Sequence, residues 1–389
     1  KRHFLGYAFH SRSAAKFLLV RLRIKVLPYL LLTQTPCLSA SKWEIAQTSP
    51  HRIHSSINSA LDILIMLHLQ SDYANYKIQK ALFVTILIFI VSIAVLLIAS
   101  DKFVDSSEKV GLAMGIPSFV VGVTIVAFGT SLPELATSIV SVYTGTSEVV
   151  IGNAVGSNIT NILLVLGSAA IFGNGIKIEH DVMKSDMPML FGSAFLLYFA
   201  LQDFRLSVIE CILFLIVLTV FLNSSLKSND DSEEIEKSKT NPRDWITIIV
   251  GAVLIYLSAT YTIRSLEDLA TMANIPAHVI AITVMALGTS LPEVVVSLSA
   301  AKKGNHGIAV GNVLGSNIFN TYAVMAIPGL LGNLTIPEST MHFSVPFMVA
   351  VSILFGMICL TRTISKWEGI MLISFYVFFI GNMVNTHLT

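Results

Sequence analysis

The stretch Gly129-Thr130-Ser131-Leu132-Pro133-Glu134 occurs twice in this chain of 389 residues. It returns 159 residues later as Gly288-Thr289-Ser290-Leu291-Pro292-Glu293. Between residues 119–173 and 278–332, 20 of 55 aligned positions are identical, and the alignment needs no gap. Each copy places one glutamate inside an otherwise apolar segment, where a carboxylate is costly and therefore indicates a function. The repeat predicts a single cation site between two homologous halves.

A second motif follows each copy at the same spacing. The stretch 152–161, GNAVGSNITN, returns as 311–320, GNVLGSNIFN. In each copy a serine and an asparagine stand four residues apart and share a helical face. The glycines allow a second helix to approach closely. The motif therefore predicts a packing surface that also carries polar ligands. For four of its asparagines, packing alone is the alternative interpretation: Asn153, Asn158, Asn312 and Asn317.

The composition predicts a polytopic helical membrane protein. Hydrophobic residues make up 54% of the chain and charged residues 13%, about half the share that is usual in soluble domains. A net charge of +1 gives no indication of nucleic-acid binding, and the three cysteines follow no zinc or disulfide spacing. No cofactor is implied. Apolar runs of spanning length occur at about 82–105, 119–143, 148–172, 187–201, 205–222, 244–265, 278–300, 306–330, 343–361 and 367–385.

These ten spans form two halves of five, residues 80–222 and 244–389, joined by a polar linker at 223–243. Because five is odd, homologous halves must insert in opposite orientations, which predicts an all-α fold of two inverted five-helix repeats. Lys and Arg concentrate in one set of alternating loops, which includes the linker, so this set is predicted to be cytoplasmic and both ends of the ten-helix unit outside. Residues 1–75 are basic, and we expect a disordered or non-native extension there, with a transit peptide as the alternative.

Pro133 explains how the first motif could present oxygen atoms to a cation. A proline has no N–H, so the carbonyl of Gly129 loses its helical partner and the helix should break near Thr130 and Ser131. Carbonyl, hydroxyl and carboxylate oxygens are hard donors that suit Ca²⁺, Na⁺ or Mg²⁺. A proline kink with a Ser/Thr-x-x-Glu cap is the structural alternative, but it does not require a buried carboxylate in both copies.

The charge balance of the predicted site favours exchange over one-way passage. Glu134 and Glu293 supply two negative charges, and no Lys or Arg lies in the middle of any predicted span. One divalent cation, two monovalent cations or protons could balance this pair. The empty, doubly charged site is costly in a low-dielectric medium, so crossing without a load is disfavoured. Charged residues near the end of the first span and just after it, such as Asp101 and Glu108, are interpreted as solvated or next to a gate.

The doubled motifs resemble the two alpha repeats of the sodium/calcium exchanger family, within the cation/calcium exchanger superfamily. The resemblance covers residues 80–389, and the short linker is similar to that of compact prokaryotic members. It implies a ten-helix fold with pseudo-twofold symmetry, a core of spans 2, 3, 7 and 8, and spans 1 and 6 that slide over this core to alternate access.

The resemblance also implies a set of ion ligands. Calcium would be held by the carboxylates of Glu134 and Glu293 and by the backbone carbonyls of Thr130 and Thr289. Sodium sites would use the following residues: Ser131, Ser157, Ser290 and Ser316, with carbonyls near Ala127 and Ala286. Asn161 and Asn320 would lie at the central position. Some microbial relatives carry aspartate at the position of Asn320, so this chain has one ionisable group fewer.

The sequence thus predicts a secondary antiporter that exchanges Na⁺ for Ca²⁺ by alternating access. The alternatives are a Ca²⁺/H⁺ or a K⁺-dependent Na⁺/Ca²⁺ antiporter on the same scaffold. An intramembrane enzyme is disfavoured because the spans hold no Ser/Lys or Ser/His dyad, no Asp pair and no HExxH. A passive channel is disfavoured because channels usually assemble rings of identical subunits. We expect a bacterial inner membrane, with an organellar membrane as the alternative. The lipid bilayer is the only partner indicated.

Overall fold

The computed structural model describes residues 50–178, 180–184, 186–227, 241–273, 275 and 288–388. The chain divides into two units, residues 1–77 and 78–389. In the first unit, residues 50–77 are helical and belong to α2 (Pro50–Met114), within the stretch 1–75 where we expected a disordered or non-native extension. Good helix formers such as Ala, Leu and Met between residues 60 and 67 account for this difference. Residues 1–49 lie outside the described part.

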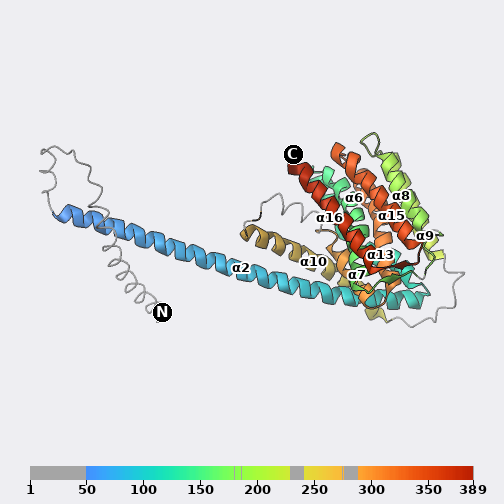
Figure 1. Ribbon diagram of the computed structural model, residues 1–389, viewed down its shortest axis with the longest axis horizontal. Helices are drawn as coiled ribbons and strands as arrows, with labels where there is room; N and C mark the ends of the chain where they lie inside the picture. The colour runs from blue at the N-terminus through green and yellow to red at the C-terminus, as the bar shows by residue number, and fades with distance from the viewer. Residues whose placement is uncertain are drawn as a thin grey trace. The chain divides into compact units, whose positions relative to one another are not determined.

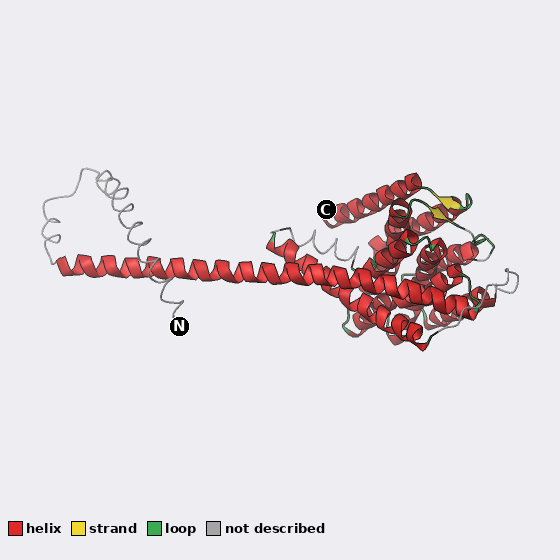
Figure 2. Ribbon diagram, turned by 90° about the horizontal axis from the view of Figure 1, so that it is seen from below, coloured by secondary structure: helices red, strands yellow, loops and turns green. Residues whose placement is uncertain are grey.

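The described residues of the second unit are mostly helical, with two short strands among the connecting loops (Figures 1 and 2). After α2, its first half contains α3 (Ser118–Val121), η3 (Gly122–Val126), α4 (Ala127–Thr130), α5 (Leu132–Tyr143), α6 (Glu148–Thr160), η4 (Asn161–Leu166), α7 (Gly167–Phe172), β1 (Ile176–Lys177), α8 (Asp186–Ala200) and α9 (Val208–Lys227). Its second half contains α10 (Pro242–Met272), α12 (Leu291–Lys302), α13 (His306–Phe319), η5 (Asn320–Val324), α14 (Met325–Leu331), η6 (Thr340–Ser344), α15 (Val345–Cys359), β2 (Thr363–Ile364) and α16 (Lys366–Leu388). The η elements are π-helical turns.

Seven helical stretches in the described residues are long and apolar enough to cross a membrane, and they match seven of the ten predicted spans. Their bounds are Gln79–Met114, Ser118–Tyr143, Glu148–Phe172, Val208–Leu226, Pro242–Met272, Thr340–Cys359 and Lys366–Asn385. The predicted span at 187–201 forms the shorter α8, and the one at 306–330 is helical throughout but carries polar asparagines. The predicted span at 278–300 is described only from residue 288. The count of ten stays a prediction.

The predicted linker at 223–243 is shorter than expected. Helix α9 continues to Lys227 and α10 already begins at Pro242, so the described helices take up both ends of that stretch. Asn241 caps α10: its side chain accepts a hydrogen bond from the Arg243 amide, and the Asp244 carboxylate accepts one from the Asn241 amide. This reciprocal cap fixes where the helix begins.

Contacts between loops agree with the predicted alternation of sides. Strand β1, in the loop after the third span, pairs antiparallel with β2, in the loop after the ninth (Figure 2). Ser147, in the loop after the second span, hydrogen bonds to Thr335, in the loop after the eighth. Each pairing joins two loops that were assigned to the same side. Which side faces the cytoplasm stays a prediction.

Helix α13 runs through the middle of the bundle (Figure 1). Every residue from 308 to 326, from α13 through η5 into the start of α14, is buried. It crosses the second span backbone to backbone. A Cβ atom on Gly311 would lie 2.3 Å from the carbonyl oxygen of Phe119, and one on Gly315 would lie 2.3 Å from that of Val123. Only glycine fits at such a crossing, as expected for small-residue packing in membranes. This crossing positions the residues of the site.

Candidate cation-binding site

The first copy of the first motif interrupts a helix where the sequence predicts a break, and in the second copy a helix begins at the matching position. Helix α4 ends at Thr130 and α5 begins at Leu132, with Ser131 between them at φ −88° and ψ 3°. In the second copy α12 begins at Leu291, and Ser290 has φ −84° and ψ 1°. The two serines thus share nearly the same backbone conformation. Because each proline follows in the first turn of the new helix, its missing N–H causes no further loss there.

The second motif ends, in both copies, at the start of a π-helical turn. The turn η4 begins at Asn161 and η5 begins at Asn320, positions that are 159 residues apart. Turns of this kind are rare and occur frequently at functional sites, because they widen the helix and displace its hydrogen bonds. The sequence predicted the importance of both asparagines but not this backbone geometry.

The two motifs pair across the repeats. The Thr130 hydroxyl, from the first copy, donates to Oδ1 of Asn312 at 3.1 Å and lies 3.4 Å from Oγ of Ser316, both from the second copy. The same hydroxyl also lies 3.3 Å from the Ala127 carbonyl oxygen in its own helix. These contacts hold the break in the second span against α13.

The other pair repeats this arrangement with the copies exchanged. The Thr289 hydroxyl donates to Oδ1 of Asn153 at 3.1 Å and lies 3.2 Å from Oγ of Ser157. Each GTSLPE segment therefore contacts the second motif of the opposite half. The site is shared by the two halves and is not duplicated within them.

Asn153 and Asn312 do more than pack, and this corrects the packing-alone interpretation for these two residues. The Asn153 amide donates to the backbone carbonyl of Glu134 at 2.9 Å and to Oγ of Ser138 at 3.0 Å. The Asn312 amide donates to Oγ of Ser297 at 2.9 Å. With its NH₂ group held this way, each asparagine turns its oxygen toward a motif threonine. The two serines were absent from the predicted site, although they are identical at an offset of 159 residues.

Asn158 and Asn317 serve the packing of α6 on α13, as the packing interpretation expects. The Asn317 amide donates to the backbone carbonyl of Asn158 at 3.3 Å. The Asn158 amide donates to Oγ1 of Thr321 at 2.9 Å. These contacts link the third span to the eighth.

The two glutamates are fully buried, and their charges are mostly uncompensated. Oγ of Ser131 lies 3.4 Å from Oε1 of Glu293 and donates to it. The other three carboxylate oxygens of Glu134 and Glu293 have no hydrogen-bond partner in the described residues. The Glu134 carboxylate is close enough to Glu293 for the two charges to interact. A buried charge without a partner is costly, so these carboxylates favour either a bound cation or a bound proton.

Asn161 and Asn320 present unpaired amides to the same region. Both side chains are fully buried, and neither their oxygen nor their nitrogen has a partner among the described residues. The turn that Asn161 begins packs against α12, which carries Glu293, and the turn that Asn320 begins packs against α5, which carries Glu134. Unpaired buried amides are rare, and they indicate a place for an ion or water.

Three further predicted ligands, Ser290, Ala127 and Ala286, differ in burial, in hydrogen bonding and in whether the structure describes them. Ser290 is buried at the break in the second copy, as Ser131 is in the first. The Ala127 carbonyl accepts hydrogen bonds from the Ser131 amide at 3.0 Å and from the Thr130 hydroxyl, so part of its capacity is used within the helix. Ala286 lies outside the described residues. The described residues contain no group of three or more His, Cys, Asp or Glu placed to hold a metal.

The chain matches a family model described as sodium/calcium exchanger protein over residues 84–227 and 243–384. It is similar to a protein named sodium/calcium exchanger MaX1 from Methanosarcina acetivorans, with 33% identity over 76% of this chain and 97% of the relative. It is also similar to an uncharacterized membrane protein, MJ0091, from Methanocaldococcus jannaschii, with 32% identity over 76% of this chain and 96% of the relative.

A solved structure has the same fold. The sodium-calcium exchanger NCX_Mj, in crystals soaked with Na⁺ and Sr²⁺, superposes with a TM-score of 0.68 and 32% identity. The match covers 76% of this chain and 97% of that one.

Proposed function

The chain belongs to the sodium/calcium exchanger family, and we propose that it exchanges Na⁺ for Ca²⁺ across a membrane by alternating access. One observation carries the proposal: two buried glutamates, one from each repeat, leave three carboxylate oxygens without a hydrogen-bond partner in the described residues. A pair of negative charges matches one Ca²⁺, and the hydroxyls and amides around it are the hard oxygen ligands that Ca²⁺ and Na⁺ prefer.

Exchange follows from the cost of the empty site. With neither Ca²⁺ nor Na⁺ bound, ionised Glu134 and Glu293 would leave two uncompensated charges in a fully buried place. That state is high in free energy, so the protein reorients only when one load has replaced another. The inverted five-helix halves suit this cycle, because two related halves can open the same site first to one side and then to the other.

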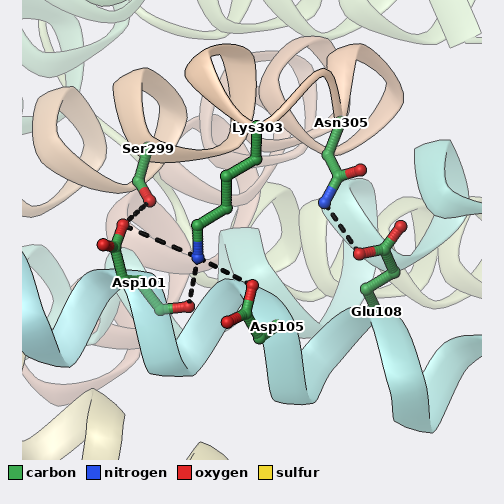
Figure 3. Close-up of polar contacts among 6 residues, drawn as sticks. All are labelled: Asp101, Asp105, Glu108, Ser299, Lys303 and Asn305. Atoms are coloured by element: carbon green, nitrogen blue, oxygen red, sulfur yellow. Dashed lines mark hydrogen bonds and ion pairs between the residues drawn. The ribbon is translucent and has the colours of Figure 1, made fainter.

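Access to the glutamates requires a helix to move, because both side chains are completely buried. The first span, which the family resemblance assigns to the moving part, is one candidate: only 17% of its most apolar stretch is buried, against 61% and 72% in the second and third spans and 22% in Val208–Leu226 and Lys366–Asn385. A polar cluster ties its end to the second repeat (Figure 3). Nζ of Lys303 lies 2.7 Å from Oδ1 of Asp105, and Nδ2 of Asn305 lies 2.7 Å from Oε2 of Glu108. Sliding of α2 would have to break these contacts.

Ion-specific flux in vesicles of the purified protein tests the proposal. An outward Na⁺ gradient should drive ⁴⁵Ca²⁺ uptake, and Glu134→Gln and Glu293→Gln should each abolish it. Glu148→Gln is the matched control, because Glu148 is exposed at the start of α6. Uptake that persists without a Na⁺ gradient but stops when the pH gradient collapses would instead assign a Ca²⁺/H⁺ antiporter. An absolute requirement for K⁺ would assign the K⁺-dependent exchanger. Normal transport by either glutamine variant would show that the site is misassigned.

We further propose a prokaryotic inner membrane as the location. The short loops predicted to be cytoplasmic carry most of the Lys and Arg, and two of these loops meet in the β1–β2 pairing. The predicted orientation places the loop with residue 146 outside the cell and the loop with residue 363 in the cytoplasm. The accessibility of single cysteines at these two positions to an impermeant thiol reagent tests it. The first should react from outside intact cells and the second should not.

A further inference from the structure

An apolar groove of about 330 Å³ lies between α2 and α10, away from the cation site. Ile98 on α2 and Val250 and Leu254 on α10 contribute to its walls, and all three side chains are exposed. Lys102 and Thr247 are the only polar residues among those that line it. In the membrane such a groove faces hydrocarbon, and its walls offer too few polar partners to hold water. An acyl chain fills it best, since an empty groove forfeits the dispersion contacts of its lining.

Two cations lie on the two helices that form the groove. Lys102 lines it directly and is exposed. Arg243 stands three, four and seven residues before the lining residues Ile246, Thr247 and Val250, so it shares their helical face and continues the groove wall toward the start of α10. Both long side chains can follow apolar surface and place their charges at the membrane interface.

The neighbouring acids are engaged elsewhere. Asp101 and Asp105 both form ion pairs with Lys303 on the α12 side of α2, as Figure 3 shows. The Asp244 carboxylate accepts the backbone N–H of Asn241 in the helix cap. Within the described part of the chain, neither Lys102 nor the guanidinium of Arg243 forms an ion pair. Their charges are therefore available to a phosphate group.

We propose that this groove binds one anionic phospholipid of the bilayer, with an acyl chain between α2 and α10 and its headgroup phosphate on Lys102 and Arg243. The lipid site is independent of which ions the protein exchanges. Both walls belong to spans that the family resemblance assigns to the moving part, so an occupied groove would also influence the transport rate.

Contact between a reporter tryptophan and labelled lipids tests the proposal. The three tryptophans, Trp43, Trp245 and Trp367, are replaced by phenylalanine, and Ile98→Trp places one reporter in the groove. The protein is reconstituted in phosphatidylcholine vesicles that contain equal fractions of brominated phosphatidylglycerol or brominated phosphatidylcholine. Brominated phosphatidylglycerol should quench the reporter preferentially, because each cation near the surface favours an anionic lipid about fivefold.

Two charge variants and two controls decide the outcome. Lys102→Gln should reduce the preference about fivefold, and the further change Arg243→Gln should remove it. Lys109→Gln on the same helix should leave it intact. A reporter placed at Val377, on the exposed face of α16, should show no preference. Equal quenching by the two lipids at Ile98→Trp, or a preference that survives loss of both cations, would overturn the proposal. Detergent elution profiles confirm that each variant is folded before it is measured.

Discussion

Gly311→Ala should separate the two spans that build the site. The added Cβ would lie 2.3 Å from the Phe119 carbonyl oxygen and 2.9 Å from the Val123 amide nitrogen, whereas ordinary contact begins at 3.4 Å. The obstacle is backbone on both sides, so no rotamer change relieves it. The backbones of the second span and α13 must move apart by about 1.1 Å, which is the difference between 3.4 Å and 2.3 Å. Overpacking of this kind costs about 1–3 kcal/mol of stability.

The displacement should affect transport as well as stability. The residue that follows, Asn312, receives the Thr130 hydrogen bond at 3.1 Å, and a shift of about 1 Å would lengthen it past 3.5 Å. Loss of one buried hydrogen bond costs about 1 kcal/mol. If that contact shapes the cation site, the apparent affinity for Ca²⁺ should fall about fivefold or more.

The assay compares Gly311→Ala with Gly192→Ala in purified protein. A Cβ on Gly192, in α8, meets nothing within 4 Å among the described residues, so this control should be neutral or slightly stabilising. Thermal unfolding in detergent gives stability, and ⁴⁵Ca²⁺ uptake as a function of Ca²⁺ concentration gives affinity. Wild-type affinity and stability in Gly311→Ala would refute the close crossing of the second and eighth spans.

Three further changes probe separate parts of the account. Asn312→Ala removes the partner of the Thr130 hydroxyl, so half-maximal uptake should require about tenfold more Ca²⁺. Asn317→Ala only loosens the packing of two helices, so it should lower stability more than Ca²⁺ affinity. Lys303→Met frees α2 from a half-exposed ion pair worth at most about 1 kcal/mol. Turnover should therefore rise up to about fivefold, with a nearly unchanged unfolding midpoint. Unaltered turnover would mean that the polar cluster does not restrain the helix. Asn320→Asp adds a carboxylate to the centre, so uptake should fall more steeply as pH decreases; a pH profile that matches wild type would remove Asn320 from the site.

The sequence alone predicted a mostly helical membrane fold and two buried glutamates, because both depend on local chemistry. The count of ten spans and the ion-binding role of the glutamates stay predictions. A glutamate within an apolar segment, a proline four residues after a glycine and a gapless internal repeat are visible without coordinates. The partners of each motif were not predictable in this way. That Thr130 contacts Asn312, while Asn153 contacts Thr289, depends on how the spans cross, and the pattern along one helix contains no record of its neighbour. The π-helical turns at Asn161 and Asn320 escaped prediction for a similar reason, since they arise from backbone packing. The helical start of α2 was missed because the basic residues of that region outweighed its helix formers in our interpretation.

Anomalous diffraction from calcium in crystals of the wild-type protein tests the central claim most directly. If the two halves share one cation, a single strong peak should lie within about 2.3–2.6 Å of carboxylate oxygens from both Glu134 and Glu293. The peak should weaken as Na⁺ replaces Ca²⁺ in the crystal solution. A peak that contacts only one of the two glutamates, or separate peaks on each, would contradict a site made jointly by the repeats.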